Sequence, residues 1–173
     1  MSFSPAGKVA GALFVTTAGA SLVAVAANWP SHALQLFHAG TAAGVLAVIA
    51  VRFALRVPSP PPSRLDLSLF VGAIIAQAVA MPAILPRLHG DLRLIWLTVL
   101  AIAALHFLPM GRPLGRWIVL LGAAGLCVAA LGYLAPGIPI QAVIAAFGVL
   151  EIGAGAAAAA RFWPQPGLAA ATI

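Results

Sequence analysis

The chain has 173 residues, of which 63% are hydrophobic and 7% charged, and its formal net charge is +6. A soluble domain has too little polar surface to cover so apolar a composition, so an ordinary water-soluble enzyme is excluded and most of the surface is expected to face lipid. The nine Lys and Arg residues stand between apolar runs without forming a basic cluster, which excludes a nucleic-acid-binding domain.

Hydropathy divides the chain into six apolar segments, each long enough for a transmembrane helix. About 20 residues of α-helix cross a hydrocarbon core of about 30 Å. Transmembrane strands alternate apolar and polar residues, whereas these segments are apolar on every side. We therefore predict an all-α fold, a polytopic transmembrane bundle of six helices in a single domain over residues 1–173. The helices are expected at residues 9–28, 33–57, 65–85, 92–108, 117–135 and 138–160.

The first segment has a competing interpretation as a cleaved signal peptide. Lys8 precedes an apolar stretch, and Ala24-Val25-Ala26 before Ala27 resembles a small-residue cleavage site. Cleavage would leave five helices and an N-terminus outside. The apolar stretch is longer than the usual signal-peptide core, so we favour a retained first helix.

The second segment combines a packing motif with a polar face. Gly40 and Gly44 form a GxxxG pattern, which allows close approach of a neighbouring helix. His38 and Thr41 share one face, and Arg52 stands near the cytoplasmic end. This face is a candidate lining for a transport pathway. The alternative, which we favour for Arg52, is that its side chain extends to lipid phosphates.

The third and fourth segments contribute two further polar candidates. Gln77 lies near the centre of the third segment, at about the depth of Glu151, so the two side chains could form a hydrogen bond across the bundle. His106 lies toward the cytoplasmic end of the fourth segment. It is either a helix-end histidine bound to a carbonyl or headgroup, or a proton shuttle. Asp66 is interpreted as a partner of the third helix dipole.

Small residues and one acid mark the last two segments. Gly122 and Gly125 lie in the fifth segment. In the sixth, we expect a small and polar face to turn inward and a bulky face to meet lipid. The inward face is predicted to hold Gln141, Ala145, Gly148, Glu151 and Gly155, and the lipid face Val143, Phe147, Leu150 and Ala154.

Glu151 is the only acidic residue deep within an apolar segment. An ionised carboxylate in hydrocarbon costs several kcal/mol, so this side chain is expected to be paired, protonated or in contact with water. Its functional interpretation is a carrier of a proton or cation, and its structural interpretation is a hydrogen-bonded tie between helices.

Cofactors, metals and catalytic motifs are not indicated. Cys127 is the single cysteine, and His38 and His106 are predicted near opposite membrane faces, which argues against a haem held between them. Neither histidine has a second ligand at suitable spacing on its own helix. The chain has no P-loop, HExxH or GxSxG motif, so no enzyme activity is predicted.

The distribution of basic residues predicts the orientation. Seven lie on the side of the N-terminus and two, Arg87 and Arg93, on the other, which predicts both termini in the cytoplasm of a bacterial-type inner (plasma) membrane. The seven are Lys8, Arg52, Arg56, Arg64, Arg112, Arg116 and Arg161.

The end of the fourth segment resembles a motif of known membrane proteins. The stretch Leu105-His106-Phe107-Leu108-Pro109-Met110-Gly111-Arg112 is similar to one in small uncharacterised bacterial six-helix membrane proteins, where His-Phe-aliphatic/aromatic-Pro ends the fourth helix. The resemblance covers one helix end and its neighbour. It implies no catalytic or binding role, because that group has no established activity.

Two functions from different classes follow. The first is a small permease or channel-like conduit for a proton, ion or small solute, with Glu151, Gln77 and His106 along the pathway. The second is a non-catalytic accessory subunit or assembly factor that packs through its glycine- and alanine-rich faces. The expected partners are the lipid bilayer and either another membrane protein or further copies of this chain.

Overall fold

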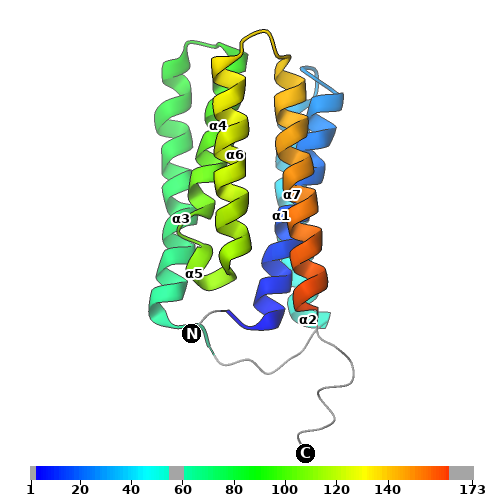
Figure 1. Cartoon of the computed structure of the whole chain (residues 1–173), viewed down its shortest axis with the longest axis vertical. Helices are drawn as coiled ribbons and strands as arrows, with labels where there is room; N and C mark the ends of the chain where they lie inside the picture. Colours follow the sequence, from blue (N-terminus) through cyan, green and yellow to red (C-terminus); the bar gives the residue numbers. More distant parts are fainter. Residues whose placement is uncertain (1–2, 55–60, 164–173) are drawn as a thin grey trace, which may run out of the picture.

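The computed structural model describes residues 3–54 and 61–163, apart from the side chain of Arg52, and within these residues the chain is helical without strands (Figure 1). The all-α prediction is therefore confirmed. The elements in chain order are α1 (Pro5–Ala27), α2 (Ala33–Ala54), α3 (Arg64–Ile84), the 3-10 helix η1 (Leu85–Leu88), α4 (Leu92–Phe107), α5 (Gly111–Leu114), α6 (Arg116–Leu134) and α7 (Ile140–Phe162).

Each of the six predicted segments overlaps one long helix, and the differences lie at the ends. Helix α1 begins at Pro5, earlier than predicted, because the Ser4 hydroxyl accepts a hydrogen bond of 3.2 Å from the Gly7 amide and proline suits the first helical turn. Helix α7 begins only after Pro139. The short elements η1 and α5 were not predicted, since they lie within connections rich in proline and glycine. The predicted extension of the second helix to residue 57 lies outside the described residues.

Five helical stretches are long and apolar enough to cross a membrane: α1, most of α2, α3 together with η1, α6 and α7. Their length and composition support a membrane protein. Helix α4 is apolar but has only 16 residues, about 24 Å at 1.5 Å per residue. The crossing by α4, and with it the count of six, stays a prediction.

The helices lie side by side, and their packing does not follow chain order (Figure 1). Helix α7 packs mainly on α1, and α2 covers another side of α1. Helix α4 packs mainly on α6, and α3 lies against α4. Because the last helix pairs with the first, the first three and last three long helices do not form separate halves. Helices α2 and α3 are peripheral, since only 6% of the apolar stretch of each is buried, against 44% for α1 and α7.

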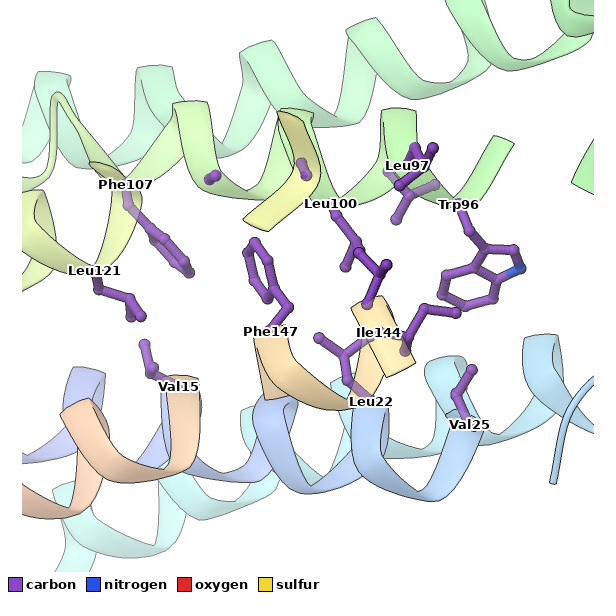
Figure 2. Close-up of a cluster of buried hydrophobic side chains, with 14 of the residues drawn as sticks. Val15, Leu22, Val25, Trp96, Leu97, Leu100, Phe107, Leu121, Ile144 and Phe147 are labelled. Atoms are coloured by element: carbon purple, nitrogen blue, oxygen red, sulfur yellow. The ribbon is translucent and has the colours of Figure 1, made fainter. Parts of the chain in front are cut away.

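The core lies where α7 meets α4 and α6 (Figure 2). Phe147 and Ile144 of α7, Leu100 of α4 and Ile118 of α6 are all 0% exposed. The prediction that Val143 and Phe147 face lipid is therefore wrong. Helix α7 is covered by α1 on one face and by α4 and α6 on another, so bulky residues on its second face enter the core.

Basic residues gather at the end of the bundle where α1 begins and α7 ends. We call this the basic end, and its described members are Lys8, Arg64, Arg112, Arg116 and Arg161. The turns between α1 and α2 and between α6 and α7 lie together at the opposite end (Figure 1).

Candidate functional site

Glu151 lies on the face of α7 that packs against α1, and its side chain is only 3% exposed. A Cβ atom placed on Gly19 of α1 would lie 2.7 Å from the Cβ of Glu151, so the two helices approach closely at this level. The Oε2 atom of Glu151 is buried and has no hydrogen-bond partner among the described residues. A buried carboxyl oxygen without a hydrogen-bond partner is unusual in a protein interior.

Glycines bring the α1 and α7 backbones into contact around Glu151. A Cβ on Gly19 would lie 2.5 Å from the carbonyl oxygen of Gly148, and a Cβ on Gly148 would lie 2.6 Å from the carbonyl oxygen of Gly19. One helical step further, a Cβ on Gly155 would lie 2.6 Å from the Ala12 carbonyl oxygen. Only glycine fits at these three positions without a shift of the helices. We call Gly19, Gly148, Glu151 and Gly155 the glycine contact.

The polar groups of α1 near the glycine contact already have partners. Thr16 approaches Gly155, and its hydroxyl donates a 3.0 Å hydrogen bond to the Ala12 carbonyl of its own helix. Ser21 donates in the same way to Ala18, at 2.8 Å. These hydroxyls are therefore bonded along α1. Gly19 and Thr16 were not predicted as part of the site, although the spacing of Ala12, Thr16 and Gly19 indicates a small-residue face on α1.

The other predicted pathway residues lie on other helices. Gln77 is half-buried on α3, which packs against α4, α5 and η1. His106 is half-buried on α4, its Nδ1 atom is buried without a hydrogen-bond partner among the described residues, and its ring lies 4.3 Å from that of Phe107. Within the described residues, no hydrogen bond joins any two of Gln77, His106 and Glu151. The hydrogen bond that Gln77 and Glu151 could have formed is therefore absent among the described residues.

His38 and Thr41 are exposed on α2. The extensive packing of α2 is against α1. The Thr41 hydroxyl donates to the Phe37 carbonyl at 3.0 Å, and the His38 ring lies 6.0 Å from the Phe37 ring. Both side chains therefore lie on the outer surface of the bundle rather than beside Glu151.

The predicted packing glycines lie at helix contacts. A Cβ on Gly40 would collide with the Ser21 side chain, and one on Gly44 would lie 2.8 Å from the Phe14 ring, so this pair sets the α1 to α2 contact. A Cβ on Gly122 would lie 2.8 Å from the Ala104 carbonyl oxygen, and one on Gly125 would lie 2.6 Å from the Phe147 ring.

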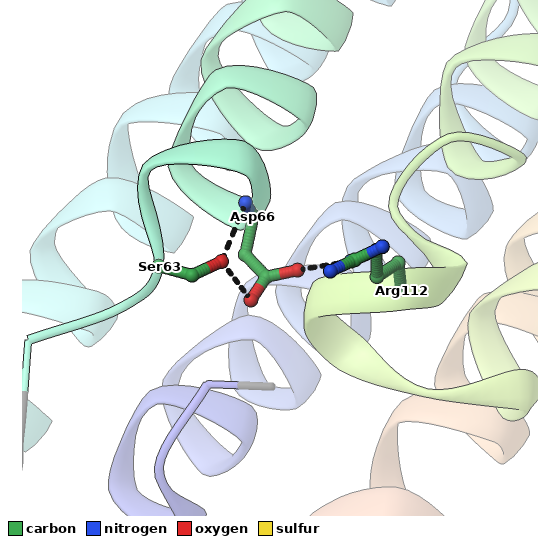
Figure 3. Close-up of polar contacts among 3 residues, drawn as sticks. All are labelled: Ser63, Asp66 and Arg112. Atoms are coloured by element: carbon green, nitrogen blue, oxygen red, sulfur yellow. Dashed lines mark hydrogen bonds and ion pairs between the residues drawn. The ribbon is translucent and has the colours of Figure 1, made fainter. Parts of the chain in front are cut away.

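A second polar cluster joins α3 to α5 at the basic end (Figure 3). Asp66 is 0% exposed, and its Oδ1 accepts a 2.9 Å bond from Nε of Arg112. The Ser63 hydroxyl donates to Oδ2 of Asp66 at 2.5 Å and accepts from the Asp66 amide at 3.1 Å. The predicted dipole partner is thus also an ion-pair partner of α5, a contact that spacing along the chain does not reveal.

Arg93 forms a third polar cluster at the opposite end. Its Nη1 donates to the Ile138 carbonyl at 2.7 Å, and its Nη2 donates to the carbonyls of Gly132 and Ala135 at 2.5 and 3.3 Å. These carbonyls end α6 or follow it, where intrahelical partners are missing. Arg93 therefore fastens the first turn of α4 to the turn between α6 and α7.

Metal chemistry gains no support from the described part of the chain. Within residues 3–54 and 61–163, no three side chains of His, Cys, Asp or Glu lie together in a way that could hold a metal ion. Cys127 is exposed on α6.

Together, the long apolar helices and their packing into one bundle define a membrane-type helical protein. Residues 59–160 match the model of a family of unknown function, DUF6609, and the chain belongs to this family. The match runs from the residues before α3 into α7 and includes Asp66, Gln77, His106 and Glu151. A search of curated proteins and a search of solved structures find no match to the chain.

Proposed function

We propose that this protein is a small permease or channel-like conduit in which Glu151 takes up and releases a proton while an ion or small solute crosses the membrane. In this proposal α4 completes six crossings. Both termini lie in the cytoplasm of a bacterial-type inner membrane.

The observation that carries the proposal is the buried Oε2 atom of Glu151, which has no partner among the described residues. A charged side chain within the bilayer costs roughly 2.5 kcal/mol or more, and intramembrane acids mark ion and proton pathways by default. An acid used only to tie helices together would be expected to bond a neighbouring group with both oxygens satisfied. The free oxygen supports a proton or cation as its intermittent partner.

The glycine contact supports a way for Glu151 to change its surroundings. The α1 and α7 backbones touch through Gly19, Gly148 and Gly155, so the closest contacts between these helices are made at glycines. A small sliding or separation of α7 on α1 would bring the carboxylate to water without repacking the core on the other face of α7. Protonation would favour the closed contact, and release of the proton would favour the open one.

The test is proton flux into vesicles that contain the purified full chain. Pyranine inside the vesicles reports pH after a potassium gradient and valinomycin impose a membrane potential. We expect flux from the wild-type protein and none from Glu151→Gln, which keeps the size of the side chain and removes its titration. Asp91→Asn is the matched control, because Asp91 is exposed and asparagine can replace it in accepting the Leu94 amide. Equal flux from Glu151→Gln would refute the role proposed for Glu151, and no flux from the wild type would refute proton conduction without a co-transported solute.

A second candidate is the accessory subunit. Two observations favour it: the outer helices α2 and α3 are mostly exposed, and Glu151 lies away from the surface grooves. Glu151 lines neither the surface groove beside α1 and α2 nor the surface groove between α6 and α7. Gly72 on α3 has open space beside it, so a Gly72→Phe substitution would disturb a partner rather than the bundle. Loss of a co-purifying membrane protein from this variant, but not from wild type, would support the subunit.

A further inference from the structure

A groove of about 800 Å³ lies between α6 and α7 on the outer surface at the basic end. The two helices are antiparallel and are joined by a short turn at the opposite end (Figure 1). Helix α6 begins at the basic end, and α7 ends there. The walls of the groove are apolar and outward-facing, since Leu120 is 70% and Val149 60% exposed. The groove therefore opens toward lipid.

Cations from three helices converge at the mouth of this groove. Lys8 of α1, Arg116 of α6 and Arg161 of α7 all line it. The Nζ atom of Lys8 lies 5.0 Å from the centre of the Phe162 ring, and the Arg161 guanidinium carbon lies 5.8 Å from the same centre. The ring thus holds two of the cations together, within the distance of a cation–π contact.

The chain supplies no acid to neutralise these three cations. It has three acidic side chains in all. Asp66 is bonded to Ser63 and Arg112, Asp91 caps α4 at the opposite end, and Glu151 is buried against α1. Within the described residues no acidic side chain lines the groove, so its three cations favour an anion from outside the chain.

The depth of the apolar part identifies the kind of anion. From Arg161 to Val149 the groove follows α7 for about 18 Å, close to the thickness of one leaflet of the hydrocarbon core, about 15 Å. Gly153 and Ala157 leave little side-chain bulk on this side of α7, and a Cβ on Gly153 would meet nothing within 4 Å. A soluble anion would use the cations but leave the apolar channel empty.

We propose that this groove is a binding site for one anionic phospholipid, whose phosphate lies between Lys8, Arg116 and Arg161 and whose acyl chain follows the channel between α6 and α7. The site is separate from Glu151. The lipid-binding proposal therefore does not depend on proton transport.

The charge requirement is tested by native mass spectrometry of the full chain in detergent. The protein is titrated with phosphatidylglycerol or with phosphatidylcholine of the same acyl chains. Wild type is expected to prefer phosphatidylglycerol, and the double variant Arg116→Gln/Arg161→Gln to bind it about 25-fold more weakly. Arg64→Gln/Arg87→Gln changes the net charge equally outside the groove and is expected to bind as wild type. Equal binding of the two lipids, or equal losses in the two double variants, would overturn the proposal.

The acyl-chain requirement is tested by filling the channel. Gly153→Leu is expected to weaken phosphatidylglycerol binding about tenfold and to leave the binding of soluble glycerol phosphate unchanged. Gly72→Leu is the matched control, because Gly72 also has open space beside it but lies on α3 away from the groove. Circular dichroism checks that each variant is folded, and Ala157→Leu replaces Gly153→Leu if the latter is not. If a folded variant with a leucine in the channel bound phosphatidylglycerol as tightly as wild type, the groove would bind only the phosphate. This result would overturn the proposal.

Discussion

Gly19 and Gly148 show how one hydrogen atom in place of a methyl group sets the distance between two helices. The clash that a Cβ on Gly19 would make is with backbone and Cβ atoms of α7, which cannot rotate away. We expect Gly19→Ala to lower the free energy of unfolding by about 1–3 kcal/mol, the usual cost of overpacking. The measurement is reversible unfolding in mixed micelles of increasing sodium dodecyl sulfate content.

The control for this substitution is Gly72→Ala on α3, where an added Cβ meets nothing within 4 Å. Alanine is preferred over glycine in a helix by about 0.5–1 kcal/mol, so this variant is expected to be as stable as wild type or slightly more so. Equal stability of the two variants would show that the α1 to α7 backbones can separate freely.

Arg93 can be tested by changing its ability to donate several hydrogen bonds. Its guanidinium reaches the carbonyls of Gly132, Ala135 and Ile138, and a lysine offers one compact ammonium instead of a planar fork. We expect Arg93→Lys to destabilise the protein moderately and Arg93→Leu by about 1.5–3 kcal/mol, since hydrogen bonds to a charged group are lost. Arg87→Leu, at an exposed site of η1, is expected to have little effect in the same unfolding assay.

Residue type alone predicted part of the candidate site. The sequence singled out Glu151 as the acid deep within an apolar segment, and its side chain is buried. Its neighbours were not predictable in this way. Gly19 lies more than a hundred positions away, and its contact with α7 depends on which helices become neighbours, which hydropathy does not encode.

At the scale of elements, the cluster of Ser63, Asp66 and Arg112 links the start of α3 to α5. Asp66 is fully buried, whereas the Arg112 side chain is 56% exposed, so most of the contribution is expected from the bonds that satisfy the carboxylate. We expect a double-mutant cycle of Asp66→Asn and Arg112→Gln to give a small favourable coupling free energy, reduced by the exposure of the arginine.

The cycle is measured by the same reversible unfolding as above, at low and high salt. A coupling that falls as salt rises is expected for a half-exposed ion pair. A coupling of zero at low salt would mean that α5 is held by its other contacts, for example the buried Leu114.

Apolar length predicted the long helices because each must satisfy its backbone hydrogen bonds internally in lipid. The same rule does not determine which helices pack against each other. Helices joined by short connections commonly pack as neighbours. Helix α7, however, packs mainly on α1, and bulky Val143 and Phe147 lie in the core. The short elements η1 and α5 escaped prediction because single turns leave no periodic signal.

For the whole molecule, the two ends of the bundle differ in charge. The basic end holds Lys8, Arg64, Arg112, Arg116 and Arg161, whereas the opposite end holds Arg87 and Arg93 among the described residues. Arg93 is bonded to backbone carbonyls, which leaves Arg87 as the exposed cation there. This asymmetry supports the proposed orientation with the basic end in the cytoplasm.

The orientation and the number of crossings are tested together by labelling cysteines in intact cells. In a Cys127→Ala background, which has no cysteine, single cysteines are placed at Ser31 before α2, at Pro61 before α3 and at Gly137 between α6 and α7. A membrane-impermeant maleimide is expected to label the Ser31→Cys and Gly137→Cys variants in intact cells, and the Pro61→Cys variant only after the cells are opened.

The comparison between positions 31 and 137 decides whether α4 crosses. Helices α2, α3, α4 and α6 lie between these positions, so four crossings return the chain to the same side, whereas three leave it on opposite sides. The turns that hold these two positions lie at the same end of the bundle (Figure 1), as four crossings between them require. Labelling of one position but not the other would show that α4, at 16 residues, does not span the bilayer, and would end the six-helix proposal.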